Sequence, residues 1–151
     1  MAFDMRPGSL EELGLAVALR QELDALGRAA DIRVKLTAPA GDDMDLPADV
    51  EIGLYRIVRG AFANIVQHAD AHEVGVIISV SADHVTLVVT DDGVGFDVDA
   101  LMAAPTAERF GILAMHERVE MLSGTVCVES ALGEGTAVFV SVPVGSPGSG
   151  A

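Results

Sequence analysis

Residues 85–96 read VTLVVTDDGVGF, which joins an apolar run to a turn that contains two glycines. The apolar residues through Val89 predict a β-strand, and Asp91 stands where the last inward-pointing side chain of that strand should lie. Gly93 and Gly95 can take positive φ angles, and they let a ligand approach the bare backbone. The stretch therefore predicts a pocket for a base and a phosphate. An ordinary turn has the same composition, so the rest of the chain must decide between the two interpretations.

The composition fits one domain with a hydrophobic core. The chain has 151 residues, of which 50% are hydrophobic, and its mean hydropathy is +0.43. This is enough material for one domain and too little for two. There are 23 acidic and 9 basic residues, and the formal charge of -14 argues against a nucleic-acid-binding surface. An anionic ligand would need a metal ion or backbone donors. The single cysteine, Cys127, excludes a disulfide framework.

No targeting or membrane segment is evident in the sequence. Every apolar stretch is shorter than the roughly 18 residues that a bilayer-spanning helix needs. Residues 1–8 also lack the apolar region of a signal peptide. We therefore expect a soluble, cytoplasmic domain without direct membrane contact.

Hydrophobic periodicity predicts three main helices and five strands. The helices cover residues 9–28, 47–70 and 111–122, and the strands cover residues 31–37, 73–80, 85–90, 125–129 and 136–142. Ser9 and Glu12 form a capping box at the first helix. Residues 97–109 are weakly patterned and contain Pro105, which predicts a mobile loop with about one helical turn. The order is not a regular βαβ repeat. It predicts an α/β (α+β) two-layer sandwich, with a mixed sheet and about three helices packed on one face.

Asn64 is the second informative residue, because it lies at the edge of the buried stripe of the helix predicted over residues 47–70. At helical spacing Gly60, Gln67 and His68 share its face, while Phe62 points toward the core. An amide oxygen in that position could coordinate Mg²⁺, a hard cation that prefers oxygen ligands. A solvated or capping asparagine is the alternative interpretation.

Four motifs, taken in order, resemble those of a known ATPase superfamily. They are Asn64, the segment DDGVG at residues 91–95, Phe110-Gly111-Ile112, and Gly133-Glu134-Gly135-Thr136. Their order is similar to that of the N, G1, F/G2 and final Gly-x-Gly-Thr motifs of the gyrase, chaperone, histidine kinase and mismatch-repair ATPases. This resemblance implies a Bergerat-type ATP-binding fold.

Longer segments resemble one branch of that superfamily. The segments are RPGSLEELGLAVAL, LPADVEIGLYRIV, NIVQHADA and RFGILAMHERVEMLSG. They look like the ATP-binding catalytic domain of bacterial two-component sensor histidine kinases of the nitrate-response or DesK-like type. Such kinases pair with response regulators that carry a helix-turn-helix output. The resemblance covers roughly residues 6–143.

The resemblance implies ATP and Mg²⁺ as cofactors and assigns roles to residues. Asp91 would accept a hydrogen bond from the adenine amino group, helped by Thr136, and Gly93 and Gly95 would make room for the base. Asn64 would hold Mg²⁺ against the phosphates. His68 would lie beside Asn64. The implied binding residues are Asn64, His68, Asp91, Gly93, Gly95, Phe110, Gly111, Ile112, Gly135 and Thr136, with Asn64 also the metal ligand.

The resemblance further implies a lid over residues 97–111. Gly111 would open the helix that follows, so that its free backbone N–H groups and the positive end of the helix dipole would face phosphate oxygens. Such donors would allow a chain with a charge of -14 to hold ATP.

The chain departs from the family at three positions. Gly60 stands where these kinases usually have a glutamate that acts as a base, so no catalytic residue is assigned. Gln67 replaces a basic residue that is common near the phosphates. Arg109 stands two residues before Gly111, where the lid usually has a glycine, and it could compensate at the phosphates.

The implied function is that of a catalytic domain that supplies phosphate to a histidine elsewhere. His116 lies on the helix after the lid and is interpreted as an ordinary exposed histidine, so the acceptor would belong to a separate dimerisation domain. Residues 1–8 are then the remnant of a linker, residues 9–143 the domain, and residues 144–151 a flexible tail. The alternatives are a catalytically degenerate regulatory module, an anti-sigma serine kinase, and a domain that binds no ligand.

Overall fold

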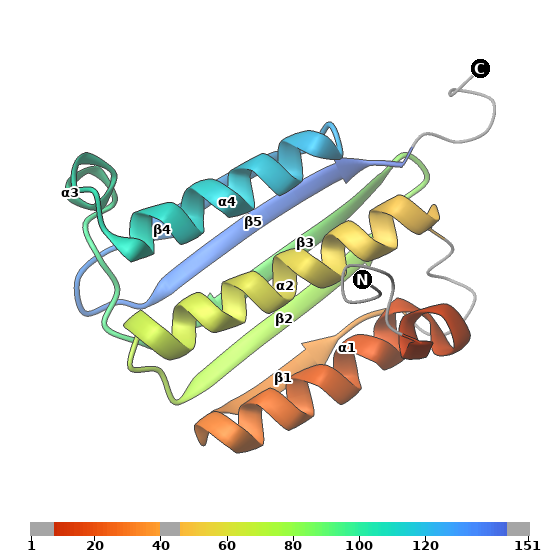
Figure 1. Ribbon diagram of the computed structural model, residues 1–151, viewed down its shortest axis with the longest axis horizontal. Helices are drawn as coiled ribbons and strands as arrows, with labels where there is room; N and C mark the ends of the chain where they lie inside the picture. The colour runs from red at the N-terminus through yellow and green to blue at the C-terminus, as the bar shows by residue number, and fades with distance from the viewer. Residues whose placement is uncertain (1–7, 40–45, 145–151) are drawn as a thin grey trace.

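One five-stranded sheet packs against three long helices in the computed structural model shown in Figure 1. The structure describes residues 8–39 and 46–144. Its elements are α1 (Gly8–Ala30), β1 (Arg33–Thr37), α2 (Ala48–His68), β2 (Glu73–Val80), β3 (His84–Asp91), α3 (Val98–Ala103), α4 (Ala107–Met121), β4 (Thr125–Ser130) and β5 (Thr136–Pro143).

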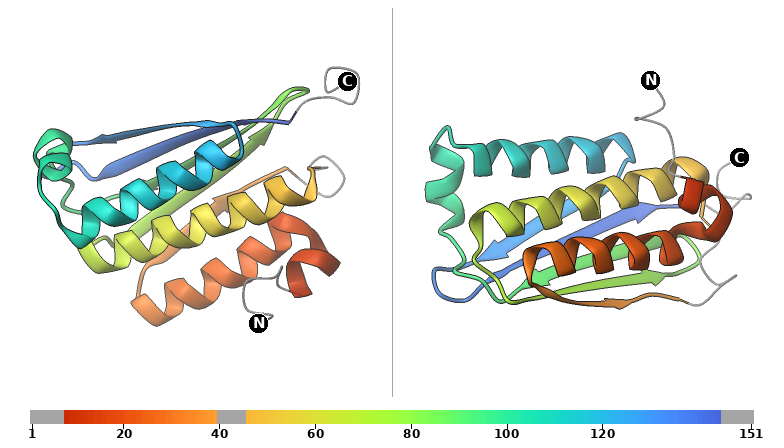
Figure 2. Two further views of the ribbon diagram at one scale, coloured as in Figure 1. Left: turned by 45° about the horizontal axis from the view of Figure 1, so that its top comes forward. Right: turned by 60° about the horizontal axis from the view of Figure 1, so that its bottom comes forward.

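The sheet is mixed, as predicted, and its strand order is β1-β2-β3-β5-β4. β1 runs parallel to β2, and the other neighbouring pairs are antiparallel. Figure 2 shows that α1, α2 and α4 cover one face of the sheet, and that no helix of residues 8–39 and 46–144 lies on the other face. The predicted two-layer α/β sandwich is therefore confirmed.

The core lies between the sheet and the helices. Alternate side chains of β2 and β3 are buried, which is the period of a strand with one covered face. α2 contributes a stripe of buried residues that pack on them. Each fully buried aliphatic or aromatic side chain stabilises the fold by about 1.5–3 kcal/mol. The largest fully buried side chains include Phe62, Leu15, Leu19, Leu23, Leu54, Ile57, Leu87, Val76 and Val85.

Two segments differ from the sequence prediction. α1 is interrupted at Gly14, whose φ of 84° and ψ of 171° are not helical. Residues 97–109 are mostly helical instead of a loop, because two side chains cap helices there. The Asp97 carboxylate accepts a hydrogen bond from the Ala100 backbone at the start of α3, and the Thr106 hydroxyl accepts one from the Arg109 backbone at the start of α4.

Some predictions fall outside what the structure describes. They are the capping box, because the Ser9 and Glu12 side chains are not described, residues 1–7 of the predicted linker, and residues 145–151 of the predicted tail. Gly8, which we had placed in the linker, is the first residue of α1. Val144, which we had placed in the tail, packs against the core and donates its backbone hydrogen to the Asp83 carbonyl at 2.9 Å. Within residues 8–39 and 46–144, no helix is long and apolar enough to span a bilayer.

Substitution of Gly60 should stabilise α2. A Cβ atom at Gly60 would meet nothing within 4 Å, so Gly60→Ala should raise the unfolding free energy by about 1 kcal/mol through helix propensity alone. Gly53→Ala is the matched control in the same helix, because its Cβ would lie 2.5 Å from a methyl group of Leu122. Urea denaturation of both variants checks this prediction. An equal gain in unfolding free energy from the two substitutions would contradict this prediction, because it would mean that the space around each glycine has no effect on stability.

Candidate functional site

A pocket lies between α2, α4 and the strand ends of β3 and β5. Six of the ten predicted binding residues line it, namely Asn64, His68, Asp91, Gly95, Ile112 and Thr136. The remaining walls are mostly apolar and come from Ala61, Ile65, Ala69, Val89, Phe96, Met115, Val128 and Val138. An apolar hollow with a few convergent polar groups is typical of a small-molecule site.

Asp91 supplies the carboxylate of this pocket. It is the last residue of β3, and one of its carboxylate oxygens, Oδ1, accepts a hydrogen bond from the Gly93 backbone at 2.8 Å. Removal from water raises the pKa of Asp91 above its ordinary value of 3.8, and this effect outweighs the hydrogen bonds from the backbones of Gly93 and Thr136. A half-buried carboxylate that faces a pocket is poised to accept hydrogen bonds from a ligand.

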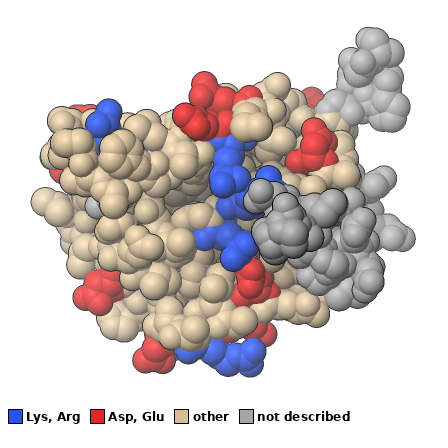
Figure 3. Space-filling model, viewed as in Figure 1, with Lys and Arg blue, Asp and Glu red and all other residues tan. Residues whose placement is uncertain are grey.

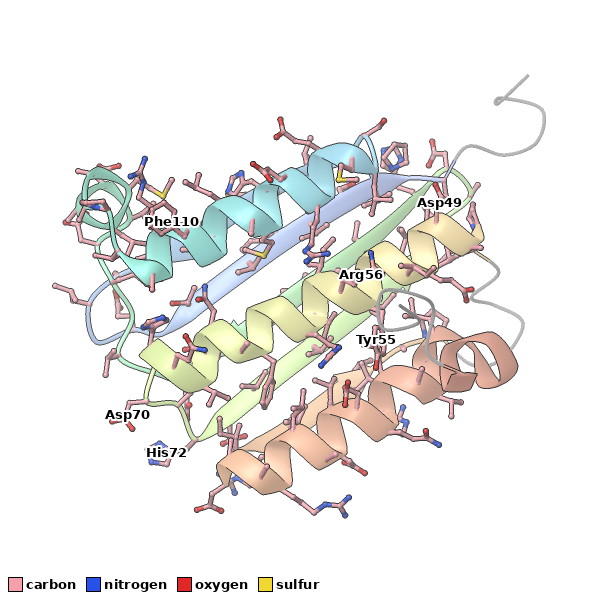
Figure 4. All side chains as sticks on the ribbon, in the orientation of Figure 1. Asp49, Tyr55, Arg56, Asp70, His72 and Phe110 are labelled. Atoms are coloured by element: carbon pink, nitrogen blue, oxygen red, sulfur yellow. The ribbon has the colours of Figure 1, made fainter. Side chains whose placement is uncertain are left out.

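Asp92, the next residue, has the opposite environment. Its exposed carboxylate accepts hydrogen bonds from the backbones of His72 and Glu73 at 2.8 and 2.9 Å. These bonds hold the pKa of Asp92 below its ordinary value. Figure 4 shows His72 and Asp70 beyond the end of α2, at the edge where β2 begins. Asp92 therefore ties the glycine turn to the start of β2, while Asp91 faces the pocket.

The glycines of the turn permit close packing of the backbone. The Val94 backbone donates to the Ala69 carbonyl at 2.7 Å, and a Cβ at Gly93 would collide with that same carbonyl. Gly95 has a φ of 66°, and a Cβ there would collide with the Ala131 carbonyl. Gly93 therefore does not line the pocket. It brings the turn against the end of α2.

Ser130 is a site residue that the sequence prediction missed. Its hydroxyl lies 2.9 Å from the Phe96 backbone nitrogen, 2.8 Å from the Gly135 carbonyl and 2.9 Å from the Thr136 hydroxyl. Gly135 itself packs against the Asp91 backbone. Ser130 is paired with Thr136 across the β4–β5 hairpin. The predicted strand ended one residue earlier, at residue 129, and the position opposite Thr136 was the signal that could have found Ser130.

Gly111 does not open a helix, and that prediction was wrong. The Thr106 cap starts α4 four residues earlier, at Ala107, so Gly111 lies inside the helix. A Cβ at Gly111 would be 2.7 Å from the Asn64 side-chain oxygen, Oδ1. The absence of a side chain at this position therefore lets α4 pack directly against Asn64 on α2. Any backbone donors at the positive end of the α4 dipole belong to its first turn instead.

The other predicted residues divide between the pocket and its surroundings. Ile112 forms part of the apolar wall, whereas Phe110 is 59% exposed and lies at the start of α4 (Figure 4). His68 lines the pocket, and its Nε2 atom is buried without a hydrogen-bond partner among the described residues. Arg109 is not part of the pocket lining, so the structure offers no support for its compensating role in this arrangement.

Gly60 and Gln67 line a second hollow between α1, α2 and α4, with a volume of about 680 Å³. Arg56, Arg59 and Arg118 also line it, and we call it the arginine groove. Figure 3 shows these cations gathered in the middle of the helix-covered face, with acidic residues around them.

Two of the groove's side chains already have partners on α1 and α2. Arg59 forms an ion pair with Glu22 at 2.9 Å, and its guanidinium lies 5.9 Å from the centre of the Tyr55 ring. The Tyr55 hydroxyl donates to the same Glu22 carboxylate at 2.9 Å, and Figure 4 shows its side chain between the two helices. This network joins α1 to α2 and holds the Arg59 guanidinium against α1.

The pocket is narrow in this structure. Its free volume is only about 40 Å³, well below the roughly 300–1,000 Å³ of typical ligand pockets. That volume suits water-sized molecules. A ring ligand would therefore require the apolar side chains on α4, such as Ile112 and Met115, to move apart.

Comparison with known proteins extends the likeness from these motifs to most of this chain. Residues 49–146 match the family described as histidine kinase-, DNA gyrase B- and HSP90-like ATPase. The signal transduction histidine-protein kinase/phosphatase DegS of Bacillus subtilis (strain 168) is 31% identical over 142 residues, which are 92% of this chain and 36% of that protein. An uncharacterized sensor-like histidine kinase of Chloroflexus aurantiacus is 33% identical over 149 residues, which are 97% of this chain and 25% of that protein. The chain thus spans roughly a third or less of these relatives.

A solved structure supports the fold. The histidine kinase domain of the Erythrobacter litoralis EL346 blue-light activated histidine kinase gives a TM-score of 0.68 at 22% identity, over 86% of this chain and 61% of that one. At this identity the likeness concerns the fold alone, and it agrees with the ATPase-domain architecture that the motifs implied.

Asp91→Asn should stabilise the ligand-free protein at neutral pH, because it removes a carboxylate whose charged form is poorly solvated. The raised folded-state pKa sets the sign. The contribution of protonated Asp91 to the free energy of unfolding is fully present below pH 3.8. It is lost as the pH rises through the higher pKa that Asp91 has in the folded state. The unfolding free energy of Asp91→Asn should therefore exceed that of the wild type by a margin that grows with rising pH and then levels off. Urea denaturation across the acidic to neutral range measures it, and a gap that widens as the pH falls would refute this reading of Asp91.

Proposed function

The chain belongs to the histidine kinase-, DNA gyrase B- and HSP90-like ATPase family, and we propose that it is the ATP-binding catalytic domain of a sensor histidine kinase. The observation that carries the proposal is the pocket itself. The half-buried Asp91 carboxylate and the Thr136 side chain lie at its polar end, and Asn64 lines its wall on α2.

The residues that line the pocket suit an adenine base, once the side chains on α4 have moved apart to admit it. Apolar side chains such as Val89, Val138 and Met115 offer surfaces for a flat ring. Asp91 would accept a hydrogen bond from the adenine amino group, and a charged acceptor strengthens such a bond. His68, whose Nε2 atom has no partner among the described residues, offers a further polar contact from α2.

Mg²⁺ would arrive with the nucleotide and not from a preformed cage. No cluster of three or more His, Cys, Asp or Glu side chains that could hold a metal occurs within residues 8–39 and 46–144. Mg²⁺ keeps several waters and takes few protein ligands when it binds with phosphates, so one amide oxygen from Asn64 fits that pattern. Once bound, the ion would neutralise charge on the phosphates.

The domain would supply the γ-phosphate of ATP to a histidine on a separate dimerisation domain, for relay to a response regulator with a helix-turn-helix output. Its relatives are much longer than this chain, which leaves room for such a domain in a parent protein. A requirement for ATP supports a cytoplasmic location for this part of the parent protein. The charge of -14 argues against direct binding of nucleic acid by this domain.

A catalytically degenerate, regulatory domain is the second candidate, and Gly60 favours it. The position is exposed and has open space around it, so a glutamate side chain would fit there without a clash. Phosphoryl transfer depends mainly on positioning and charge stabilisation, so the missing carboxylate would slow the reaction without removing the binding of nucleotide.

Nucleotide binding is the first test. Calorimetry with ADP and Mg²⁺ should detect binding to the wild type, and Asp91→Asn should weaken it at least about tenfold, because a hydrogen bond to a charged group is lost. The matched control is Asp92→Asn, which changes the neighbouring carboxylate and keeps an oxygen acceptor for the His72 and Glu73 backbones. If the wild type fails to bind, or if both variants bind equally well, the proposal is wrong.

Restoring the carboxylate on α2 tests the catalytic role. In the parent kinase, Gly60→Glu should raise the rate of histidine phosphorylation by about 10²-fold, the lower end of what a positioned acid–base group contributes. Gly60→Gln has nearly the same size without the charge and should give no gain. Equal rates for both variants and the wild type would reject a carboxylate role at this position.

A further inference from the structure

We propose that Ser130 fixes the direction of the Thr136 hydroxyl, so that the polar end of the pocket selects a ring that carries an amino group over one that carries a carbonyl. This inference rests on the proposed nucleotide binding and adds to it a residue that sets base specificity. Ser130 would be a positioning residue, because it acts through Thr136 and does not itself line the pocket.

The Ser130 hydroxyl joins three separate parts of the site. It lies 2.9 Å from the backbone nitrogen of Phe96, after the glycine turn. It lies 2.8 Å from the Gly135 carbonyl and 2.9 Å from the Thr136 hydroxyl, both on the other side of the β4–β5 turn. All three contacts are partly buried, so water does not compete freely for them.

The chemistry of these partners fixes where each proton lies. The Phe96 N–H can only donate, and the Gly135 carbonyl can only accept. Ser130 has one hydroxyl proton, and it donates this proton in its hydrogen bond to the Gly135 carbonyl. The oxygen of Ser130 is then an acceptor in its two other contacts, which matches its two lone pairs. The Thr136 hydroxyl must therefore donate its proton to Ser130.

The direction of this bond determines what Thr136 presents to the pocket. Thr136 lines the pocket, and with its proton directed to Ser130 its hydroxyl oxygen has only lone pairs to offer a ligand. Asp91, which is paired with Thr136 across β3 and β5, is an acceptor as well. The polar end thus offers two acceptors, which suit the two N–H bonds of a ring amine and repel a carbonyl oxygen.

The backbone of the same turn keeps the arrangement in place. The Gly133 backbone donates to the Val94 carbonyl at 2.6 Å, and Gly95 packs against the Ala131 carbonyl. The glycine turn and the β4–β5 turn are therefore held together without Ser130. For that reason Ser130→Ala should free the Thr136 hydroxyl to rotate while the two turns stay in contact.

The test is the selectivity between ADP and inosine diphosphate, which has a carbonyl where adenine has its amino group. Binding of both nucleotides is measured by calorimetry with Mg²⁺. Ser130→Ala should reduce the preference for ADP by about three- to tenfold, the value of one neutral hydrogen bond, because the freed Thr136 hydroxyl can donate to the carbonyl. Ser130→Thr keeps the hydroxyl and should preserve the preference. Ser79→Ala, at an exposed position on β2, is the control.

A purely structural role for Ser130 predicts a different result. In that case Ser130→Ala would weaken both nucleotides equally and leave their ratio unchanged, which would overturn the proposal. A double-mutant cycle with Thr136→Val sharpens the test. Once Thr136 has no hydroxyl, Ser130→Ala should not change the ratio further, whereas additive effects of the two substitutions would also overturn it.

A measurement on the ligand-free protein separates this inference from the proposed function. The Thr136 hydroxyl proton should exchange slowly enough with water to give an NMR signal in the wild type, and Ser130→Ala should remove that signal. If the wild type binds no ADP, the proposed function and the selectivity fail together, while the NMR signal still decides the direction of the bond. A signal that survives Ser130→Ala refutes the assigned direction whether or not nucleotide binds.

Discussion

The half-buried carboxylate of Asp91 is the constraint on which the rest of the site depends. A carboxylate at the end of a strand loses hydration when a helix and a second strand pack around it, and the raised pKa of Asp91 reflects that loss. The backbone around it must therefore come close enough to supply hydrogen bonds. The Gly93 amide supplies one such bond, and the absence of a side chain at Gly135 lets the β4–β5 turn approach the Asp91 backbone.

Burial of the hydrophobic core offsets the free-energy cost of desolvating the Asp91 carboxylate. The sheet and helices bury an aliphatic core that runs from Leu15 on α1 to Val142 on β5, and the polar site occupies only one end of that layer. Asp92 reinforces the same end, since its exposed carboxylate ties the turn to β2. The two adjacent aspartates therefore have different roles. Asp92 holds the glycine turn, and Asp91 faces the pocket.

The sequence alone predicted the mixed sheet, its five strands and the glycine turn after Asp91, because strand alternation and glycine-rich turns are local signals. Local signals did not predict the start of α4. The weak apolar pattern and Pro105 concealed the Thr106 cap, so Gly111 was placed at a helix start instead of against Asn64. That contact joins two helices far apart in the sequence, and only the tertiary structure sets it. The break in α1 at Gly14 was missed because the apolar pattern continues across it.

The pKa of Asp91, followed by NMR of its side-chain carboxyl carbon with and without ADP and Mg²⁺, is the most direct test of this view of the site. We expect a pKa above 3.8 in the free protein, as desolvation requires, and a lower pKa with ADP, because an amino group that donates to the carboxylate favours its charged form. If Asp91 titrates at 3.8 or below in the free protein and ADP leaves the pKa unchanged, this carboxylate is neither desolvated nor the group that recognises the base.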